Sequence, residues 1–315
     1  MGAQLRVYRS RIRSVQSTKK ITKAMELIAA SRLTKARARM TAARPYAAEL
    51  TRALAALGKN ASLQHPMLTG VENPRRAGIL LVTSDRGLAG GYNANAIKRA
   101  NELAHRLEGE GKQVVRYVIG RKGVAYYRFR NIPVSGSWTG FSEQPNFADA
   151  RAATEAVVAA LTATSSSESH GEAGIDELYV VFTQFKNSVS QLPVIALVSP
   201  VKGAGDDEVE TESIEADVEH GPQPSYEFEP EPAQLIAALL PRYISARIYS
   251  ALLESATSES AARRRAMKSA SDNATELIST YTRLANQARQ AEITQEISEI
   301  VGGADALAAA GSDGR

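Results

Sequence analysis

The sequence contains no cysteine, which excludes disulfides, thiolate metal sites and a cysteine nucleophile. Its four histidines (His65, His105, His170 and His220) lie far apart, so no zinc site is expected. No apolar run approaches the roughly 20 residues that cross a bilayer, and the N-terminal "MGAQLRVYRSRIRS" lacks the apolar segment of a secretory signal. We therefore expect a soluble protein without metal or cofactor, attached to a membrane, if at all, only through partners.

Aromatic residues are also scarce, at 6% with a single Trp, which is low for one deep globular core in a chain of 315 residues. Charge is abundant but uneven, although the formal net charge is only +4. Residues 1–44 carry twelve Lys or Arg and one acid, whereas residues 203–232 carry eleven acids and no Lys or Arg. This asymmetry indicates two different partner surfaces, or one electrostatic partner and a solvated loop.

The N-terminal segment is predicted to be one long helix, because residues 3–57 contain no Gly and a single Pro. Such a helix spans roughly 80 Å, more than a compact domain of this size needs. Its apolar positions form a narrow stripe with alternating spacings of three and four, interrupted by slips: Leu5, Tyr8, Ile12 and Val15, then Ile21, Met25 and Ile28, then Leu33, Ala36 and Met40. The pattern predicts a coiled-coil seam with stutters.

The C-terminal segment has the same character, since residues 242–301 contain neither Gly nor Pro. Eight residues fall on an unbroken heptad seam in which small Ala residues suit the close approach of a second helix: Met267, Ala270, Ala274, Leu277, Tyr281, Leu284, Ala288 and Ala291. The N-terminal helix is the obvious partner, in an antiparallel or nearly antiparallel pair.

Between the helices lies a pattern typical of an α/β domain. Buried-strand patterns at 76–84 and 113–120 alternate with helical patterns, and strands at "DELYVVFTQF" and "LPVIALVSP" suggest a hairpin. The fold class expected is therefore α/β: a long antiparallel coiled coil of the terminal helices with a central Rossmann-like α/β domain. Segments 164–174 and 202–223 are polar insertions that we expect to be exposed loops.

The loop "SDRGLAGG" (84–91) lies between a strand and a helix, where phosphate-binding loops occur, and Asp85 could hold a metal there. Its glycine spacing matches neither nucleotide-binding motif, so a tight strand-to-helix connection is the favoured interpretation. The basic N-terminal helix could contact nucleic-acid phosphates, but it lacks interleaved aromatic residues and any recognition motif. No catalytic constellation is found. A stand-alone coiled-coil protein whose α/β domain binds nucleotide or nucleic acid remains an alternative.

Three blocks of the sequence resemble the gamma subunit of F-type ATP synthase. They are "SVQSTKKITKAMELIAASRLTKA" near the N-terminus, "TSDRGLAGGYNAN" in the centre and "ARQAEITQEISEIVGGADA" (288–306) near the C-terminus. The similarity covers essentially the whole chain in the expected order. It implies a non-catalytic rotor shaft that couples proton-driven rotation of the membrane c-ring to ATP synthesis in a hexamer of alpha and beta subunits.

The resemblance implies domains at 1–58 (coiled-coil helix), 76–201 (α/β domain), 202–231 (acidic loop and ring-contacting foot), 232–303 (coiled-coil helix) and 304–315 (flexible tail). It implies that Met25, Arg289, Gln290, Thr294 and Glu296 contact the catalytic subunits, and that Tyr226 and Glu229 contact the c-ring. The implied partners are the alpha and beta subunits, the epsilon subunit and the c-ring, with no nucleic acid. The implied location is the cytoplasmic face of the cell membrane, as a peripheral protein.

Overall fold

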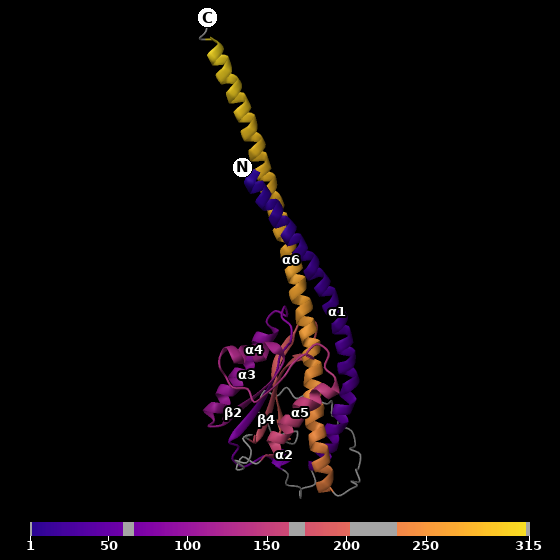
Figure 1. Cartoon of the computed structure of the whole chain (residues 1–315). Helices are drawn as coiled ribbons and strands as arrows, with labels where there is room; N and C mark the ends of the chain where they lie inside the picture. Colours follow the sequence, from indigo (N-terminus) through magenta and orange to yellow (C-terminus); the bar gives the residue numbers. More distant parts are fainter. Residues whose placement is uncertain (1, 59–65, 164–173, 202–231, 313–315) are drawn as a thin grey trace. The chain divides into compact units, whose positions relative to one another are not determined.

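The computed structural model describes residues 2–58, 66–163, 174–201 and 232–312. The polar insertions, the acidic loop and the foot expected at 202–231 lie outside this described part. The chain forms two compact units, one of residues 1–28 with 266–315 and the other of residues 29–265 (Figure 1). No helix within the described ranges is long and apolar enough to cross a membrane.

Two long helices contribute to both units. Helix α1 runs from Gly2 to Gly58 and continues through Pro45. Helix α6 runs from Pro232 to Ser312 and continues through Pro241. It therefore extends beyond residue 303, where a flexible tail was expected, because the alanine-rich end of the sequence has a high helix propensity.

In the first unit the two helices pair in an antiparallel coiled coil. Tyr8 lies beside Tyr281, with ring centroids 6.4 Å apart. Thr22, further along α1, meets Ser271, which is earlier in α6, and their hydroxyl oxygens are 2.7 Å apart. Because one residue number rises as the other falls, the contacts establish the antiparallel direction.

The stutter predicted for α1 is wrong. In the first unit the less exposed positions continue at alternating spacings of three and four, with Met25 partly buried beside the last of them: Leu5, Tyr8, Ile12, Val15, Lys19, Thr22 and Glu26. Ile21 and Ile28, expected in the seam, are 61% and 54% exposed. A stutter would locally unwind the supercoil. The unbroken heptad avoids this by placing polar residues with short or aliphatic stems, such as Thr22 and Lys19, at seam positions.

The seam of α6 is also shifted in part. Its less exposed positions include Met267, Ser271, Ala274, Ile278, Tyr281, Ala285, Ala288 and Glu292. Six of the eight predicted positions are at least partly buried, Ala270 and Leu284 among them, but Leu277 is 45% exposed and Ala291 is exposed. Adjacent residues lie about 100° apart on a helix, so periodicity could not decide whether Leu277 or its neighbour Ile278 faces α1.

The second unit contains a five-stranded sheet in the order β3-β2-β1-β4-β5. The strands are β1 (Arg76–Val82), β2 (Gln113–Ile119), β3 (Gly136–Trp138), β4 (Glu177–Phe185) and β5 (Gln191–Ser199). Strands β3, β2, β1 and β4 are parallel, and β5 pairs antiparallel with β4. This confirms the Rossmann-like centre and the terminal hairpin. The short β3 was not predicted from the sequence.

Helices cover both faces of this sheet (Figure 1). Helices α3 (Tyr92–Gly109) and α4 (Arg121–Phe129) pack on one face, where Ile79 and Leu81 of β1 meet Leu103 of α3. On the other face lie α2 (Pro66–Thr69), α5 (Phe147–Thr162) and parts of α1 and α6. With both faces covered, β1 is buried over nearly its whole length, which explains its continuous apolar sequence.

Candidate interaction surfaces

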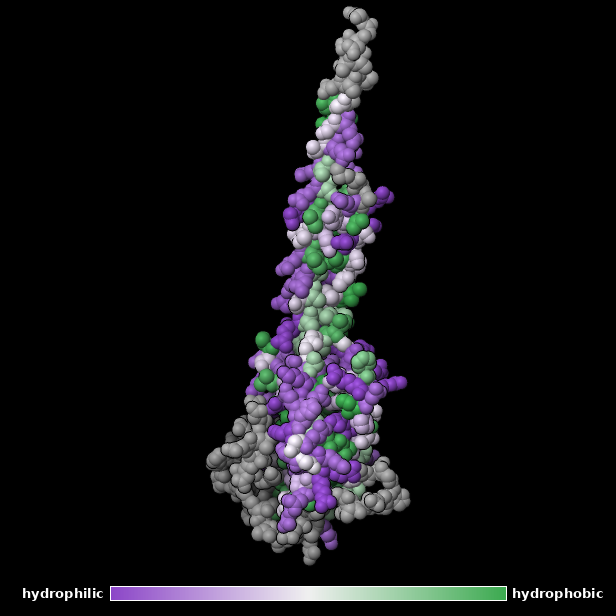
Figure 2. Space-filling model, turned by 90° about the vertical axis from the view of Figure 1, so that its left-hand side faces the viewer, coloured by the Kyte–Doolittle hydropathy of each residue, from purple (hydrophilic) through white to green (hydrophobic). Residues whose placement is uncertain are grey.

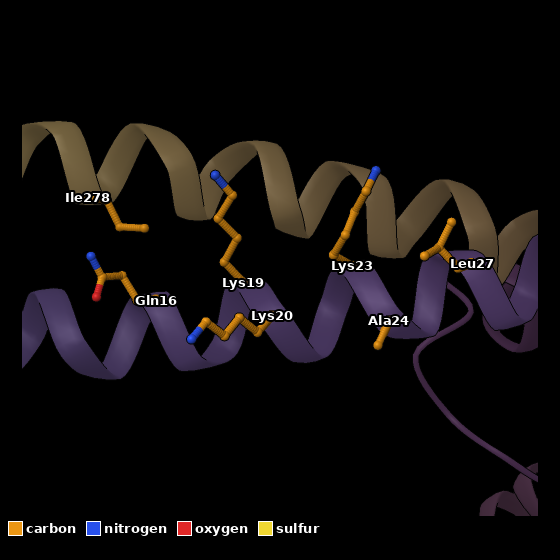
Figure 3. Close-up of a pocket in the computed structure, with 7 residues that line it drawn as sticks. All are labelled: Gln16, Lys19, Lys20, Lys23, Ala24, Leu27 and Ile278. Atoms are coloured by element: carbon orange, nitrogen blue, oxygen red, sulfur yellow. The ribbon is translucent and has the colours of Figure 1, made fainter.

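A groove of about 780 Å³ runs along the coiled coil of the first unit, lined by Gln16, Lys19, Lys20, Lys23, Ala24, Leu27 and Ile278. Leu27 is 62% exposed, so the groove has an apolar side chain open to solvent. Figure 3 shows Lys19 and Lys23 extending from α1 toward α6, whereas Lys20 lies along α1. The groove therefore combines an apolar lining with ammonium groups.

The charge of this groove is mostly unbalanced. Lys23 pairs with Glu26 at 3.0 Å, but Lys19 and Lys20 form no ion pair with any residue in the described part of the chain. Figure 2 shows hydrophilic residues along the paired helices, with separate hydrophobic patches among them. Ammonium groups beside exposed apolar side chains suit a neighbour that presents carboxylates together with one or two apolar residues.

Met25 lies within this segment of α1 and is partly buried. Its neighbours in the chain are Ala24 of the groove and Glu26 of the ion pair. A neutral thioether at this place adds contact area without adding charge.

The four C-terminal residues expected to form contacts lie elsewhere on the same unit. Arg289, Gln290, Thr294 and Glu296 are all exposed on α6. The Thr294 hydroxyl donates to the Gln290 carbonyl oxygen at 2.9 Å, while Arg289 and Glu296 form no ion pair within the described ranges. These residues follow Tyr281 in α6, whereas Met25 follows Tyr8, the partner of Tyr281, by more than two heptads in α1. In an antiparallel pair the two sets therefore lie on opposite sides of the Tyr8–Tyr281 contact. The four C-terminal residues thus form a second surface, separate from the groove. Tyr226 and Glu229 lie outside the described residues.

The loop of residues 84–91 in the second unit, here called the glycine loop, is held in place by hydrogen bonds to neighbouring segments of the chain. Asp85 accepts hydrogen bonds from the backbone N–H groups of Gly140 (2.8 Å), Ser142 (3.0 Å) and Arg121 (3.1 Å). Its own N–H donates to the Ser142 hydroxyl at 2.8 Å. The carboxylate therefore joins three loops at one end of the sheet, and this anchoring accounts for Asp85 better than the metal considered from sequence. No cluster of metal-ligating residues occurs among the described residues.

Helix α6 also holds this loop through hydrogen bonds. The Arg263 guanidinium donates to the carbonyl oxygens of Arg86 (3.1 Å) and Gly87 (3.3 Å). Tyr92, just after the loop, is buried and donates to the Ser255 carbonyl oxygen at 3.3 Å. The loop that resembles a phosphate-binding element in sequence is thus a docking element for a helix. This supports the tight-connection interpretation over nucleotide binding.

Arg263 is itself held between two acids. It lies 2.7 Å from Glu259 and 3.1 Å from Glu143. The pKa of Glu259 is raised to about 7, chiefly by burial; Arg263 opposes this shift, and the nearby Glu143 contributes to it. Sequence reasoning missed both acids. The one available signal was Arg263 and Glu259 at helical spacing of four in a stretch otherwise made of small residues.

A family model described as ATP synthase matches residues 4–307. The ATP synthase gamma chain of Salinispora arenicola is 55% identical over 318 residues, covering 99% of this chain and 100% of the relative. Relatives of the same name from Salinispora tropica and Acidothermus cellulolyticus are 56% and 54% identical, with the same coverage.

Solved structures also match along most of the chain. The rotor of Euglena gracilis mitochondrial ATP synthase gives a TM-score of 0.65 at 17% identity, covering 93% of this chain and 100% of that chain. The central stalk and c-ring structure of Tetrahymena thermophila mitochondrial ATP synthase gives 0.56 at 22% identity, covering 80% and 99%. At these identities the likeness concerns the fold.

Proposed function

The chain belongs to the ATP synthase gamma chain family, and from this premise we propose that it is the central-stalk rotor subunit of an F-type ATP synthase. It couples proton-driven rotation of the c-ring to ATP synthesis in the hexamer of alpha and beta subunits. It is not itself catalytic. The observation that carries the proposal is the antiparallel coiled coil, whose seam is narrow and whose outer face is basic.

A rotor must turn past successive partners without adhering to one of them. Exposed Lys and Arg attract acidic neighbours over distance, yet water and salt screen the attraction, and such pairs contribute about 0–1 kcal/mol each. The groove with Lys19, Lys20 and Lys23 fits an acidic loop of a catalytic subunit in this way. A broad apolar surface would instead hold the shaft in one orientation.

We assign contacts with the catalytic subunits to Met25 and to the exposed C-terminal group Arg289, Gln290, Thr294 and Glu296. Tyr226 and Glu229 are proposed to contact the c-ring, and the α/β domain to bind the epsilon subunit. We propose that the protein lies at the cytoplasmic face of the cell membrane, attached through its partners.

A purification test distinguishes this function from the nucleotide-binding or nucleic-acid-binding alternative. The full chain carrying an affinity tag should co-purify with alpha, beta and epsilon subunits and with the c-ring from its native membrane. The isolated chain should neither bind nor hydrolyse ATP. Recovery without these subunits, or micromolar affinity of the isolated chain for ATP or DNA, would favour the alternative.

A further inference from the structure

One carboxylate in the second unit is shared by three arginines from three different elements. Glu143, in the connection between β3 and α5, pairs with Arg263 of α6 at 3.1 Å and with Arg86 of the glycine loop at 3.6 Å. It also pairs closely with Arg32 of α1. From this geometry we infer that Glu143 is the positioning residue that locks the α/β domain onto both long helices.

We call the contacts of Glu143 with Arg32, Arg86 and Arg263 the Glu143 joint. Its surroundings make this joint stiff. Arg263 is 7% exposed and Glu143 15%, so water screens their attraction much less than it screens a surface pair. Arg263 is fixed further by Glu259 and by the two loop carbonyls. The contacts of Arg263 with Glu259 and of Arg32 with Glu143 are charge-assisted hydrogen bonds, which are directional, whereas apolar packing tolerates sliding.

The backbone next to Glu143 is fixed as well. The neighbouring Ser142 is bonded through its N–H and its hydroxyl to Asp85, at the start of the glycine loop. Ala89 and Tyr92 pack against Ala262, one residue before Arg263. The glycine loop and the connection between β3 and α5 are thus fixed to each other. A force on the α/β domain is therefore transmitted through these two loops to the Glu143 carboxylate.

The joint lies where both helices leave this unit. Arg32 is within one helical turn of the boundary at residue 28, and Arg263 is within one turn of the boundary at residue 265. A single group that holds both helices at this level distributes torque to both, instead of shearing one helix past the other. This inference rests on the proposed rotor function for its consequence, but the joint itself is a property of the chain.

The variant Glu143→Gln tests both the joint itself and its role in transmitting torque. The matched control is Glu102→Gln. Glu102 is 48% exposed on α3 of the same unit, and its ion pairs among the described residues are with Lys98 and Arg99 of its own helix. In the isolated full chain, hydrogen exchange of the amides of 84–91 and 140–143 should be at least tenfold faster in Glu143→Gln than in wild type or control. Unchanged hydrogen exchange in Glu143→Gln would refute the positioning role of Glu143.

The assembled complex in inverted vesicles tests the transmission of torque. With the proton gradient collapsed, ATP hydrolysis by Glu143→Gln should stay within twofold of wild type. Against an opposing gradient, protons pumped per ATP should fall about twofold, while Glu102→Gln stays at the wild-type value. A variant that merely assembles poorly would lose both activities in proportion, and that result, or unchanged pumping, would overturn the role in transmission. If wild-type vesicles pump no protons, the rotor function fails, whereas the exchange result stands independently.

Discussion

The hydroxyl groups of Thr22 and Ser271 meet at 2.7 Å in the coiled coil, although the two residues are separated by 249 positions in the sequence. Both side chains are buried, at 8% and 5% exposed. The Thr22 hydroxyl also donates to the Lys19 carbonyl oxygen at 3.1 Å, so it can accept from Ser271. A polar pair at a seam position favours one register, because a shifted helix would lose the hydrogen bond between the two hydroxyls. The contact therefore sets both the alignment of the two helices and the face that each turns inward.

Cysteines at these two positions should form a disulfide. The chain has no natural cysteine, so Thr22→Cys with Ser271→Cys creates a single defined pair. Mild oxidation should cross-link most of the protein, and non-reducing electrophoresis should show the altered mobility of a closed loop. The control is Ile21→Cys with Ser271→Cys, because Ile21 is 61% exposed. Efficient linking of the control pair and not of the first would show that the stutter predicted from sequence is correct.

The helical phase of α6, meaning which of its faces points toward α1, can be tested by placing a carboxylate at either of two adjacent positions. Ile278→Asp places a carboxylate beside the seam and should lower the free energy of unfolding by about 2 kcal/mol, the usual cost of a poorly solvated polar group. Leu277→Asp changes a side chain that is 45% exposed and should cost less than about 0.5 kcal/mol. Urea unfolding followed by helical circular dichroism measures both. Equal losses, or a larger loss for Leu277→Asp, would contradict the observed phase.

The architecture could be predicted from sequence because its signals are long or strongly apolar. Fifty-seven residues of α1 contain one interior Pro and end at Gly58, and the buried β1 is apolar over nearly its whole length. The exact seam could not be predicted from periodicity. Lys19 and Thr22 take inward positions while Ile21 and Ile28 remain exposed, and hydrophobicity alone ranks these residues in the opposite order.

The glycine loop shows a different limit of sequence reasoning. Its residues permit a phosphate-binding loop or a tight connection, and only the position of Arg263 decides between them. That arginine lies 176 residues beyond Gly87 in the sequence. Glu143 likewise stands in a loop without helical or strand periodicity, so no local pattern connects it with Arg32 and Arg263.

Neutralising the groove should weaken the attraction for acidic partners while leaving the chain folded. In Lys19→Gln/Lys20→Gln/Lys23→Gln the apolar lining by Leu27 and Ile278 is kept. We expect ATP hydrolysis by the assembled complex to fall several-fold at low salt and to depend less on salt, because screened charge pairs are lost. The matched control neutralises three exposed cations of the α/β domain that already have local partners: Lys98, Arg106 and Arg151. An equal loss in both variants would argue against a specific role for the groove.

The buried acid Glu259 links the stability of the second unit to pH. Burial raises its pKa to about 7, above the ordinary value of 4.5. The charged groups facing it are Arg263, which lowers the pKa, and Glu143, which raises it. Below pH 4.5 the side chain is protonated in the folded and unfolded states alike. Between pH 4.5 and 7 only the unfolded state ionises, so folding stability falls as the pH rises through this window.

Glu259→Gln should remove this pH dependence, since glutamine has nearly the same shape as the protonated acid. At pH 5 the variant should match wild type to within about 1 kcal/mol, because both side chains are then neutral. At pH 8 it should be the more stable protein, by up to about 3 kcal/mol if the whole shift is expressed. The comparison is made by urea unfolding of the full chain at pH 5, 6, 7 and 8. Taking the difference between the two proteins cancels the contributions of the groups that they share. A variant that is less stable at pH 8 than at pH 5, relative to wild type, would mean that the ionised Glu259–Arg263 pair stabilises the fold more than burial of its charge destabilises it.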